Sequence, residues 1–223
     1  MTVADITTRV DIVRAQIAEA ARRAGRDPAD VVLVAATKTV ETARVAELLG
    51  AGVRDVGENR AQELLAKAPV LVREPVAPRW HFVGRLQRNK VAGLAPWVSL
   101  WQSVDREPLG AAIARRVPGA AVLVEVNLGD ESQKGGCAPA HVPALVDALR
   151  GHGLEVQGLM TVHPQAGDAR RWFASLQTLG ARLGLRELSM GMSDDYELAV
   201  EQGATLVRVG RALFGDREGA ARP

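Results

Sequence analysis

Short apolar runs alternate with stretches of helical periodicity along almost the whole chain, and this pattern constrains the fold more than any other feature. Eight runs rich in Val, Leu and Trp lie at 31–36, 53–56, 80–83, 97–101, 121–126, 154–159, 185–189 and 205–209. Strands that alternate with helices pair in parallel through helical crossovers. Eight such units predict an α/β fold in which one sheet closes into a (β/α)8 barrel of the TIM type.

An open, doubly wound sheet is the alternative arrangement of the same elements. Its first turn usually carries the sequence G-x-G-x-x-G, whereas the first run here reads VVLVAATKTV and contains no glycine. The connections between the runs are also too short to hold a second domain. We therefore predict one domain over residues 1–216 and a frayed polar tail over residues 217–223.

An amphipathic helix precedes the first apolar run. Apolar residues recur at spacings of three and four from Val3 to Ala24, and Gly25 follows where a C-terminal cap belongs. This helix, assigned to residues 3–25, could form a dimerising coiled-coil seam or fold onto its own barrel. We expect the second arrangement and a monomer, because three heptads ending in alanines make a weak seam and short barrel helices leave apolar grooves to cover.

Charge, hydropathy and cysteine content exclude several classes of protein. The chain has 28 Lys and Arg against 26 Asp and Glu, and a net charge of +2 is too small for the basic face of a nucleic-acid binder. No apolar stretch approaches the roughly 18 residues of a membrane span, and the N-terminus is not that of a signal peptide. We expect a cytoplasmic protein with no membrane partner. The single cysteine, Cys137, and four scattered histidines offer neither a disulfide nor a metal site.

Chemistry in a β/α barrel gathers where the strands end, and Lys38 follows the first run. The chain has only 4 Lys among its 28 basic residues, so arginine is its ordinary choice for a solvated positive charge. A lysine amine can lose its proton and attack an aldehyde, which an arginine cannot do. Lys38 is therefore either a surface lysine at a strand end or a candidate nucleophile.

The loop after the seventh run offers a candidate phosphate site. Ser193 precedes an acidic stretch, so we place it at the N-cap of a helix. Ser193 is then either a simple cap or a phosphate ligand, because barrels commonly bind phosphate with the loops after strands seven and eight. Gly210, after the eighth run, would allow the matching close approach of the backbone.

Two further residues have no single interpretation. Strand alternation places Leu206, Arg208 and Gly210 on one face, and if that face is the barrel interior, Arg208 needs a carboxylate or a ligand as its partner. The sequence does not choose between them. His81 could belong to the core, contact a ligand or do neither.

The motifs at the strand ends resemble those of the pyridoxal-phosphate homeostasis protein family. Seven of them occur in order, namely VAATK, VGENRAQE, WHFVGRLQRNK, VEVNLGDESQKGG, GLMTV, LSMGMSDD and VRVGRALFG. The resemblance implies a single-domain barrel of the alanine-racemase N-terminal type with an extra N-terminal helix. It also implies that the chain binds pyridoxal 5′-phosphate as a lysine aldimine and helps to balance the free cofactor, without an established catalytic activity.

The resemblance assigns cofactor contacts to Lys38, Asn59, His81, Met160, Ser193, Arg208, Gly210 and Arg211. Lys38 would form the aldimine, and Ser193 would bind the phosphate together with the backbone of Gly210 and Arg211. Many members have threonine where this chain has Arg211, so one hydroxyl contact to the phosphate is lost here.

The remaining assignments concern the cofactor's ring. Arg208 would face the pyridine nitrogen, Asn59 and Met160 would line the ring, and His81 would lie nearby. A permanently charged arginine discourages protonation of that nitrogen and weakens the cofactor as an electron sink, which favours holding the cofactor over reacting with it.

Three functions stay open at this point. The first, which we favour, is a non-catalytic protein that buffers the cofactor or delivers it to apo-enzymes. The second is a cofactor-dependent amino-acid racemase. Racemases with this barrel add a tyrosine from a second domain, whereas Tyr196, the only tyrosine here, is expected within a helix. The third is a phosphosugar isomerase without a cofactor.

Overall fold

The computed structural model describes residues 5–129, 135–164 and 167–215, and its sheet closes into a barrel in the order β1 to β8. All neighbouring strands are parallel, including β8 against β1, which closes the barrel. The strands are β1 (Val32–Ala36), β2 (Asp55–Glu58), β3 (Arg79–Phe82), β4 (Val98–Val104), β5 (Ala121–Glu125), β6 (Glu155–Met160), β7 (Glu187–Ser189) and β8 (Leu206–Val209). The prediction of a closed barrel is confirmed, and the open sheet is excluded.

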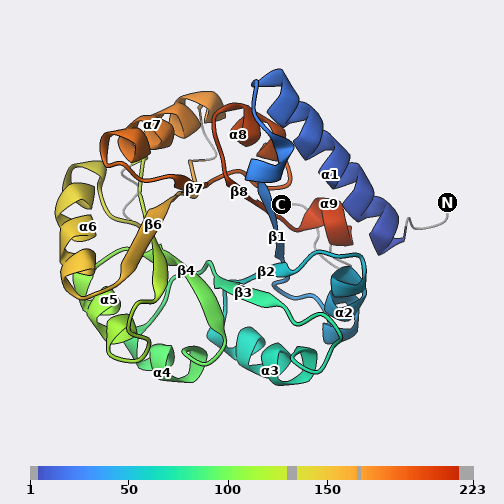
Figure 1. Cartoon of the computed structure of the whole chain (residues 1–223), viewed down its shortest axis with the longest axis horizontal. Coiled ribbons are helices and arrows are strands. Elements are labelled where there is room, and N and C mark those ends of the chain that lie inside the picture. Colours follow the sequence, from blue (N-terminus) through green and yellow to red (C-terminus); the bar gives the residue numbers. More distant parts are fainter. Residues whose placement is uncertain (1–4, 130–134, 165–166, 216–223) are drawn as a thin grey trace.

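The helices form a ring around the strands (Figure 1). They are α1 (Ile6–Arg23), α2 (Thr42–Gly50), α3 (Ala61–Leu71), α4 (Val91–Leu94), α5 (Glu107–Ala114), α6 (Val142–Gly151), α7 (Ala169–Arg182), α8 (Tyr196–Glu201) and α9 (Arg211–Phe214). Short 3-10 turns lie at η1 (Pro28–Asp30), η2 (Arg88–Lys90) and η3 (Pro139–His141). None of the helices in the described ranges is long and apolar enough to cross a membrane.

Each of the eight predicted runs overlaps one of the eight strands, but some bounds differ. The second strand begins at Asp55 rather than at residue 53, because the N–H of Val53 still bonds to Leu48 O at the end of α2. The fourth strand continues to Val104, three residues beyond its apolar run. The strand's register shifts between Trp101 and Val104, and the buried residues Gln102 and Ser103 are polar, so this end of the strand carries no continuous apolar signal.

Strand alternation divides the buried side chains into two sets. The larger set lies between the strands and the surrounding helices. A smaller apolar cluster fills part of the barrel interior and consists of Val34, Leu100, Leu123, Met160 and Leu206. The buried polar side chains Asp55, His81, Gln102, Ser189 and Arg208 share the interior with it. The core of this barrel is therefore partly polar.

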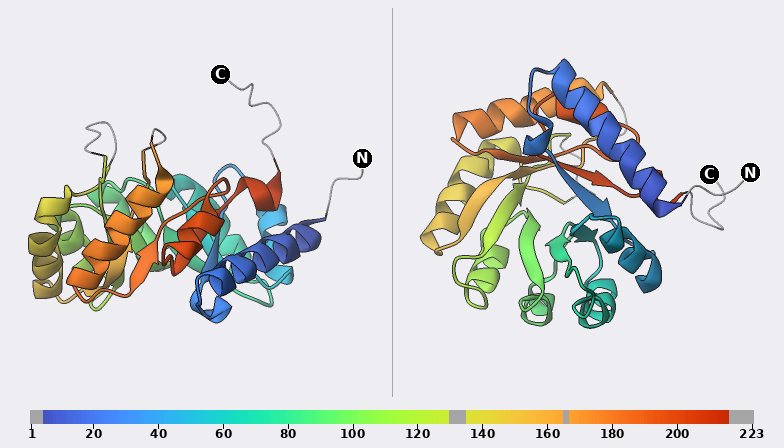
Figure 2. Two further views of the ribbon diagram at one scale, coloured as in Figure 1. Left: turned by 90° about the horizontal axis from the view of Figure 1, so that it is seen from above. Right: turned by 45° about the vertical axis from the view of Figure 1, so that its right-hand side comes forward.

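Helix α1 lies against its own barrel, as the sequence predicts. Its apolar stripe, including Val10 and Ile17, is buried, and α1 packs against α8 and α9 (Figures 1 and 2). The helix spans residues 6–23 rather than 3–25, since Ala24 is the C-cap and Gly25 follows with a left-handed φ of 67°. Residues 1–4 and the predicted frayed tail at 217–223 lie outside the described residues.

Candidate functional site at the carboxyl ends of the strands

The loops after β7 and β8 meet through Ser193 and Gly210. The backbone N–H of Gly210 donates a hydrogen bond to Ser193 Oγ over 3.1 Å. The prediction that Ser193 caps a helix is wrong, because Asp195 holds the N-cap position of α8, which begins at Tyr196. Ser193 instead extends to the next strand end, so that a hydroxyl and a backbone amide lie side by side.

The glycines of these two loops have packing reasons of their own. Gly191 has a φ of 88°, and a Cβ there would lie 2.4 Å from the side chain of Ala199 on α8. A Cβ on Gly210 would lie 3.2 Å from the carbonyl oxygen of Ala36 at the end of β1. Both glycines therefore allow the loops to pack closely on the barrel.

The acidic residues beside Ser193 are held by partners within the protein. Asp195 accepts hydrogen bonds from the N–H of Met192 and from His163 Nε2, each over 2.6 Å. Asp194 forms an exposed ion pair with Arg211. The ion pair with Arg211 offsets the charge of Asp194, and the two hydrogen bonds hold the Asp195 carboxylate in place. The Arg211 side chain is engaged with Asp194, and its backbone begins α9 next to Gly210.

Arg208 lies in the barrel interior, as alternation along β8 suggests. Its Nη1 donates to Ser189 Oγ over 2.6 Å and its Nη2 to the carbonyl oxygen of Thr161 over 2.7 Å. Burial lowers the pKa of the guanidinium to about 10, although the nearby carboxylates of Glu125 and Asp195 oppose this shift. Arg208 is therefore a charged donor at neutral pH. Its guanidinium is held by the ends of β6 and β7, which carry Thr161 and Ser189.

Glu125, the last residue of β5, is a member of this site to which the sequence assigned no role. Burial, reinforced by the negative charge of Asp105, raises the pKa of its carboxyl group to about 7. The positive charges of Arg208 and Arg85 act in the opposite direction. Strand alternation could have predicted this position, because Glu125 lies two residues after Leu123, whose side chain points into the barrel interior. A carboxyl group close to half-protonation thus lies within electrostatic reach of Arg208.

Lys38 follows β1 by two residues and is exposed. Lys38 follows Val32 and Val34 by an even number of residues, and the side chains of those two valines lie in the barrel interior. The next residue, Thr39, has a φ of 62°, and its N–H donates to Glu63 Oε2 on α3 over 2.6 Å. The turn that carries Lys38 is therefore fastened to α3.

A buried ion pair lies beside this turn, and sequence reasoning missed it. Lys67 Nζ on α3 donates to Glu58 Oε1 over 2.6 Å and to the carbonyl oxygen of Thr37 over 2.7 Å. Thr37 Oγ1 donates to the same Glu58 oxygen over 2.8 Å. Burial raises the pKa of Glu58, even though Lys67 favours its ionised form. Lys67 therefore supports the backbone that carries Lys38, and its own amine is committed.

Asn59 follows β2 and offers an unsatisfied polar atom. Its side-chain oxygen Oδ1 is buried and has no hydrogen-bond partner in the described part of the chain. A Cβ on Gly84, in the loop after β3, would lie 2.1 Å from the backbone oxygen of Asn59, so these two strand ends are in close contact. An orphaned acceptor at a strand end is a position where a bound molecule would supply the missing donor.

Met160 and His81 lie deeper than the residues at the strand ends. Met160 ends β6, is fully buried and belongs to the interior apolar cluster. His81 bonds through Nε2 to Asp55 and through Nδ1 to Gln102. Both of its ring nitrogens are thus engaged inside the barrel. Its direct contact with a ligand remains a prediction, as do the other seven assigned contacts.

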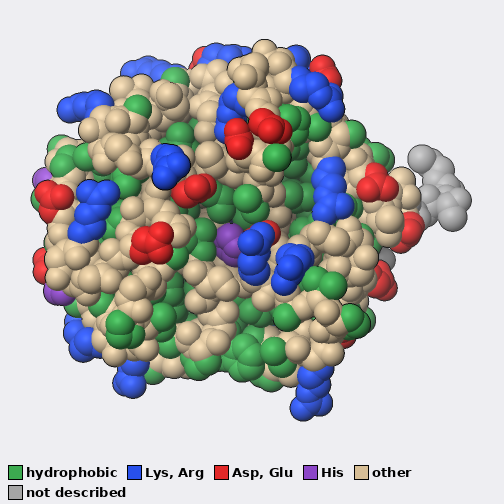
Figure 3. All heavy atoms as spheres, in the orientation of Figure 1, with side chains coloured by type: hydrophobic (Ala, Val, Ile, Leu, Met, Phe, Trp, Pro, Cys, Tyr) green, Lys and Arg blue, Asp and Glu red, His purple; other side chains and the backbone are tan. Residues whose placement is uncertain are grey.

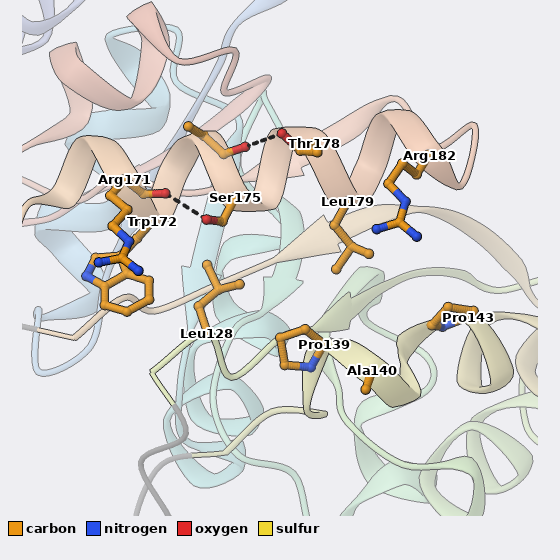
Figure 4. A pocket seen from close by; sticks show the side chains of 11 residues that line it. Leu128, Pro139, Ala140, Pro143, Arg171, Trp172, Ser175, Thr178, Leu179 and Arg182 are labelled. Atoms are coloured by element: carbon orange, nitrogen blue, oxygen red, sulfur yellow. Dashed lines mark hydrogen bonds between the residues drawn. The ribbon is translucent and has the colours of Figure 1, made fainter.

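A cavity of about 720 Å³ lies elsewhere, on the outer wall of the barrel. It runs between α7 and the segment before α6, where Trp172 and Leu179 face Leu128 and Pro139 (Figure 4). None of the eight assigned residues lines it. The hydroxyls of Ser175 and Thr178 bond to carbonyl oxygens of their own helix, which leaves this wall largely apolar.

Comparison with known families and relatives gives a consistent result. The family described as "Alanine racemase, N-terminal domain" matches residues 9–218, a range that includes all eight strands. A protein named "Pyridoxal phosphate homeostasis protein" from Pseudomonas aeruginosa is 43% identical over 223 residues, with 96% of each chain covered. A protein of the same name from Aquifex aeolicus is 40% identical and covers 94% of this chain and 97% of its own length.

Solved structures show the same similarity. PipY of Synechococcus elongatus, in a structure with PLP bound, has a TM-score of 0.82 and 33% identity and covers 94% of this chain and 100% of its own. A protein from Bifidobacterium adolescentis has a TM-score of 0.88 and 39% identity, with 94% of both chains covered. A lysine decarboxylase from Selenomonas ruminantium has a TM-score of 0.69 at 16% identity, a likeness of fold alone, and only 61% of its chain is covered.

Proposed function

The chain belongs to the pyridoxal phosphate homeostasis protein family, and from this premise we propose that it binds pyridoxal 5′-phosphate at the carboxyl ends of the strands and takes part in maintaining the supply of that cofactor. The observation that carries the proposal is the contact between Ser193 and Gly210, 3.1 Å apart, at the same end of the barrel as Arg208. It places the Ser193 hydroxyl and the Gly210 amide together where this fold commonly binds phosphate.

The residues present fit the chemical parts of this cofactor. Pyridoxal 5′-phosphate supplies an aldehyde that a lysine amine binds covalently, a pyridine ring and a phosphate dianion. Ser193 and the backbone of Gly210 and Arg211 bind the phosphate, and Lys38 is the amine for the aldehyde. Asn59, whose buried Oδ1 has no partner among the described residues, and Met160 would line the ring, and His81 would lie nearby.

Arg208 determines how the ring nitrogen is held. Its guanidinium is charged at neutral pH and presents only donors, so it binds a nitrogen that carries no proton. An unprotonated ring is a poor electron sink. The residues of this site therefore hold the cofactor rather than promote carbanion chemistry, and we propose a non-catalytic role.

The one tyrosine of the chain is not placed to serve as the second acid or base that the racemase alternative needs. The hydroxyl of Tyr196 donates to Gln16 Oε1 on α1 over 2.6 Å, and the residue is only 5% exposed. Tyr196 thus fastens α1 to α8 on the outside of the barrel. Measurable racemisation of amino acids by the purified protein would favour this alternative.

Buffering or delivery requires that the cofactor leave the protein as well as enter it. The exposure of Lys38 supports such exchange, since water and an acceptor protein can reach the strand end that carries it. We therefore include apo-enzymes as partners in the proposal. We also propose that the protein is cytoplasmic and monomeric. The packing of α1 on its own barrel supports the monomer.

The test is a titration of apo-protein with pyridoxal 5′-phosphate, followed by its visible spectrum and by transfer to an unrelated apo-enzyme. We expect one equivalent to bind with a yellow colour and then to restore the activity of the apo-enzyme. Absence of any bound cofactor would refute the proposal and would favour the isomerase alternative. Binding without transfer would limit the role to storage.

A further inference from the structure

Five polar side chains form a hydrogen-bonded chain across the barrel interior. From Arg208 the contacts lead to Ser189 over 2.6 Å, to Gln102 over 2.6 Å, to His81 over 2.7 Å and to Asp55 over 3.0 Å. These residues lie on β8, β7, β4, β3 and β2. Because β4 and β7 are not neighbours in the barrel, the contact between Ser189 and Gln102 spans the interior.

Burial makes this interior chain costly unless every member has a partner. None of the five residues is more than 7% exposed, and Gln102 and Ser189 are fully buried. A buried polar group without a hydrogen bond destabilises the fold, and partly satisfied networks are worse than apolar packing. Retaining five polar side chains where leucine and valine fill the rest of the interior therefore calls for a reason beyond packing.

The geometry also gives the interior chain a single direction. Gln102 Nε2 can only donate, so His81 Nδ1 accepts and the N–H at Nε2 donates to Asp55. On the other side Gln102 Oε1 accepts from the Ser189 hydroxyl, whose oxygen then accepts from Arg208. Every donor points from the arginine cation toward the Asp55 carboxylate, and charges of opposite sign at the two ends stabilise that order.

Asp55, the last acceptor of the interior chain, is held at the opposite end of the barrel from the candidate site. Asp55 begins β2 and also forms an ion pair with Arg79, which begins β3. Burial opposes the ionisation of Asp55, but the hydrogen bonds from His81 and Arg79 outweigh it and lower its pKa. Asp55 and Arg79 line a cavity of about 420 Å³. Figure 3 shows basic side chains and a histidine close together over β2 and β3.

We propose that this interior chain positions Arg208 for the cofactor's ring, with Gln102 and Ser189 as positioning residues, and that Asp55 fixes its direction from the far end of the barrel. This inference rests on the proposed function. Gln102 commits the Ser189 proton, which leaves the Ser189 oxygen to accept from Arg208. With Thr161 O as the second acceptor, the guanidinium is oriented before any ligand arrives, and binding then costs less side-chain entropy.

Four variants test the proposal by cofactor affinity, by the visible spectrum at saturation and by the melting temperature of the apo-protein. Ser189→Ala removes the acceptor of Arg208, and Gln102→Leu removes the acceptor of the Ser189 proton. We expect each to weaken binding by about tenfold or more and to shift the visible band. Gln102→Glu keeps an acceptor for Ser189 but loses the donor to His81 Nδ1, so its affinity should lie between those of Gln102→Leu and wild type. Thr205→Val, the control, removes a hydroxyl from the residue before β8 and should change only the melting temperature.

Nitrogen NMR of the apo-protein tests the direction of the chain without any cofactor. We expect His81 to carry its proton on Nε2 in the wild type, with the signals assigned by their loss in His81→Gln. A proton on Nδ1 instead would overturn the direction. Wild-type affinity and spectrum in both Ser189→Ala and Gln102→Leu would overturn the positioning role. Failure of the wild type itself to bind the cofactor would refute the proposed function, a result distinct from either.

Discussion

Ser193 Oγ accepts a hydrogen bond from the backbone N–H of Gly210, 3.1 Å away, although 17 residues separate the two along the chain. The contact joins the loops after β7 and β8 and places a hydroxyl beside a backbone amide. Ser193 uses its oxygen in this contact, so its hydroxyl hydrogen can still donate to a phosphate, and the Gly210 N–H can exchange the serine oxygen for a phosphate oxygen. The site is therefore built from loop-to-loop contact, and the first prediction concerns this serine.

Ser193→Ala should weaken binding of pyridoxal 5′-phosphate by about 1.5 to 3 kcal/mol, the typical contribution of a hydrogen bond to a charged group. The measurement is a fluorescence or absorbance titration of the apo-protein. Pyridoxal without phosphate should bind the variant and the wild type equally. Ser175→Ala, whose hydroxyl bonds only within α7, is the matched control. Equal affinity of Ser193→Ala and wild type for the phosphorylated cofactor would show that Ser193 serves only the fold.

Lys38→Ala should abolish the visible band and the covalent adduct that borohydride fixes, while the melting temperature stays close to that of wild type. An exposed side chain away from the core changes stability by about 0.5 kcal/mol or less. Peptide mapping of the reduced wild-type protein should find the adduct on Lys38. Lys90→Ala, on an exposed 3-10 turn, is the control. An adduct on Lys67, Lys90 or Lys134 would contradict the assignment.

Sequence reasoning reached those features that depend on local pattern. Eight alternating runs predict the barrel, and parity along β8 places Arg208 on the face with Leu206, which the structure puts in the interior. The meeting of Ser193 and Gly210 follows from the neighbouring positions of β7 and β8 in a barrel. Each of these inferences needs only the period of an element and the order of the strands.

The contacts that sequence reasoning missed depend on register and on the identity of facing elements. Gln102 accepts a hydrogen bond from Ser189 across the interior. Sequence periodicity does not show which side chains of non-adjacent strands lie at the same height along the barrel axis. Lys67 reaches Glu58 because α3 packs on β2 in one particular register. The cap of α8 was misplaced by two residues, since Ser193 bonds to another loop rather than to its own helix.

Arg208→Gln should lower cofactor affinity and introduce a pH-dependent change in the spectrum of the bound cofactor. Glutamine keeps an N–H donor and adds a carbonyl acceptor, and it removes the charge that discourages ring protonation. The check is a spectroscopic pH titration at saturating cofactor. Arg182→Gln, on the surface of α7, is the control for loss of one positive charge. A wild-type spectrum across the pH range together with wild-type affinity would mean that Arg208 does not lie beside the pyridine ring.

Val10→Asp together with Ile17→Asp should destabilise the protein by several kcal/mol without changing its mass in solution. Both side chains are at most 4% exposed on the face of α1 that packs against α8 and α9, so each aspartate would be buried without a partner. Ile12→Asp, on the exposed face of the same helix, should leave stability and mass unchanged. Light scattering over a range of concentrations is the measurement. A wild-type dimer that Ile12→Asp or the double variant separates would contradict the monomer.

Glu125→Gln should remove a pH dependence from the stability of the apo-protein. The pKa of Glu125 is raised from 4.5 to about 7 in the folded state, so between these values the folded protein binds more protons than the unfolded chain. Its free energy of unfolding therefore falls as the pH rises through this window, by roughly 3 kcal/mol at most. Asp55, whose folded pKa is lowered, acts in the opposite direction and only at more acidic pH.

Chemical denaturation of the apo-protein between about pH 5 and pH 8 measures this contribution. The Glu125→Gln variant should lose less stability than wild type across the range, because its amide cannot ionise beside Asp105. Glu155→Gln, exposed at the start of β6, should keep the wild-type slope. Identical slopes in Glu125→Gln and wild type would mean that water or a neighbouring cation already compensates the buried carboxylate. In that event Glu125 would be ionised beside Arg208 and would compete with the cofactor's ring for its donors.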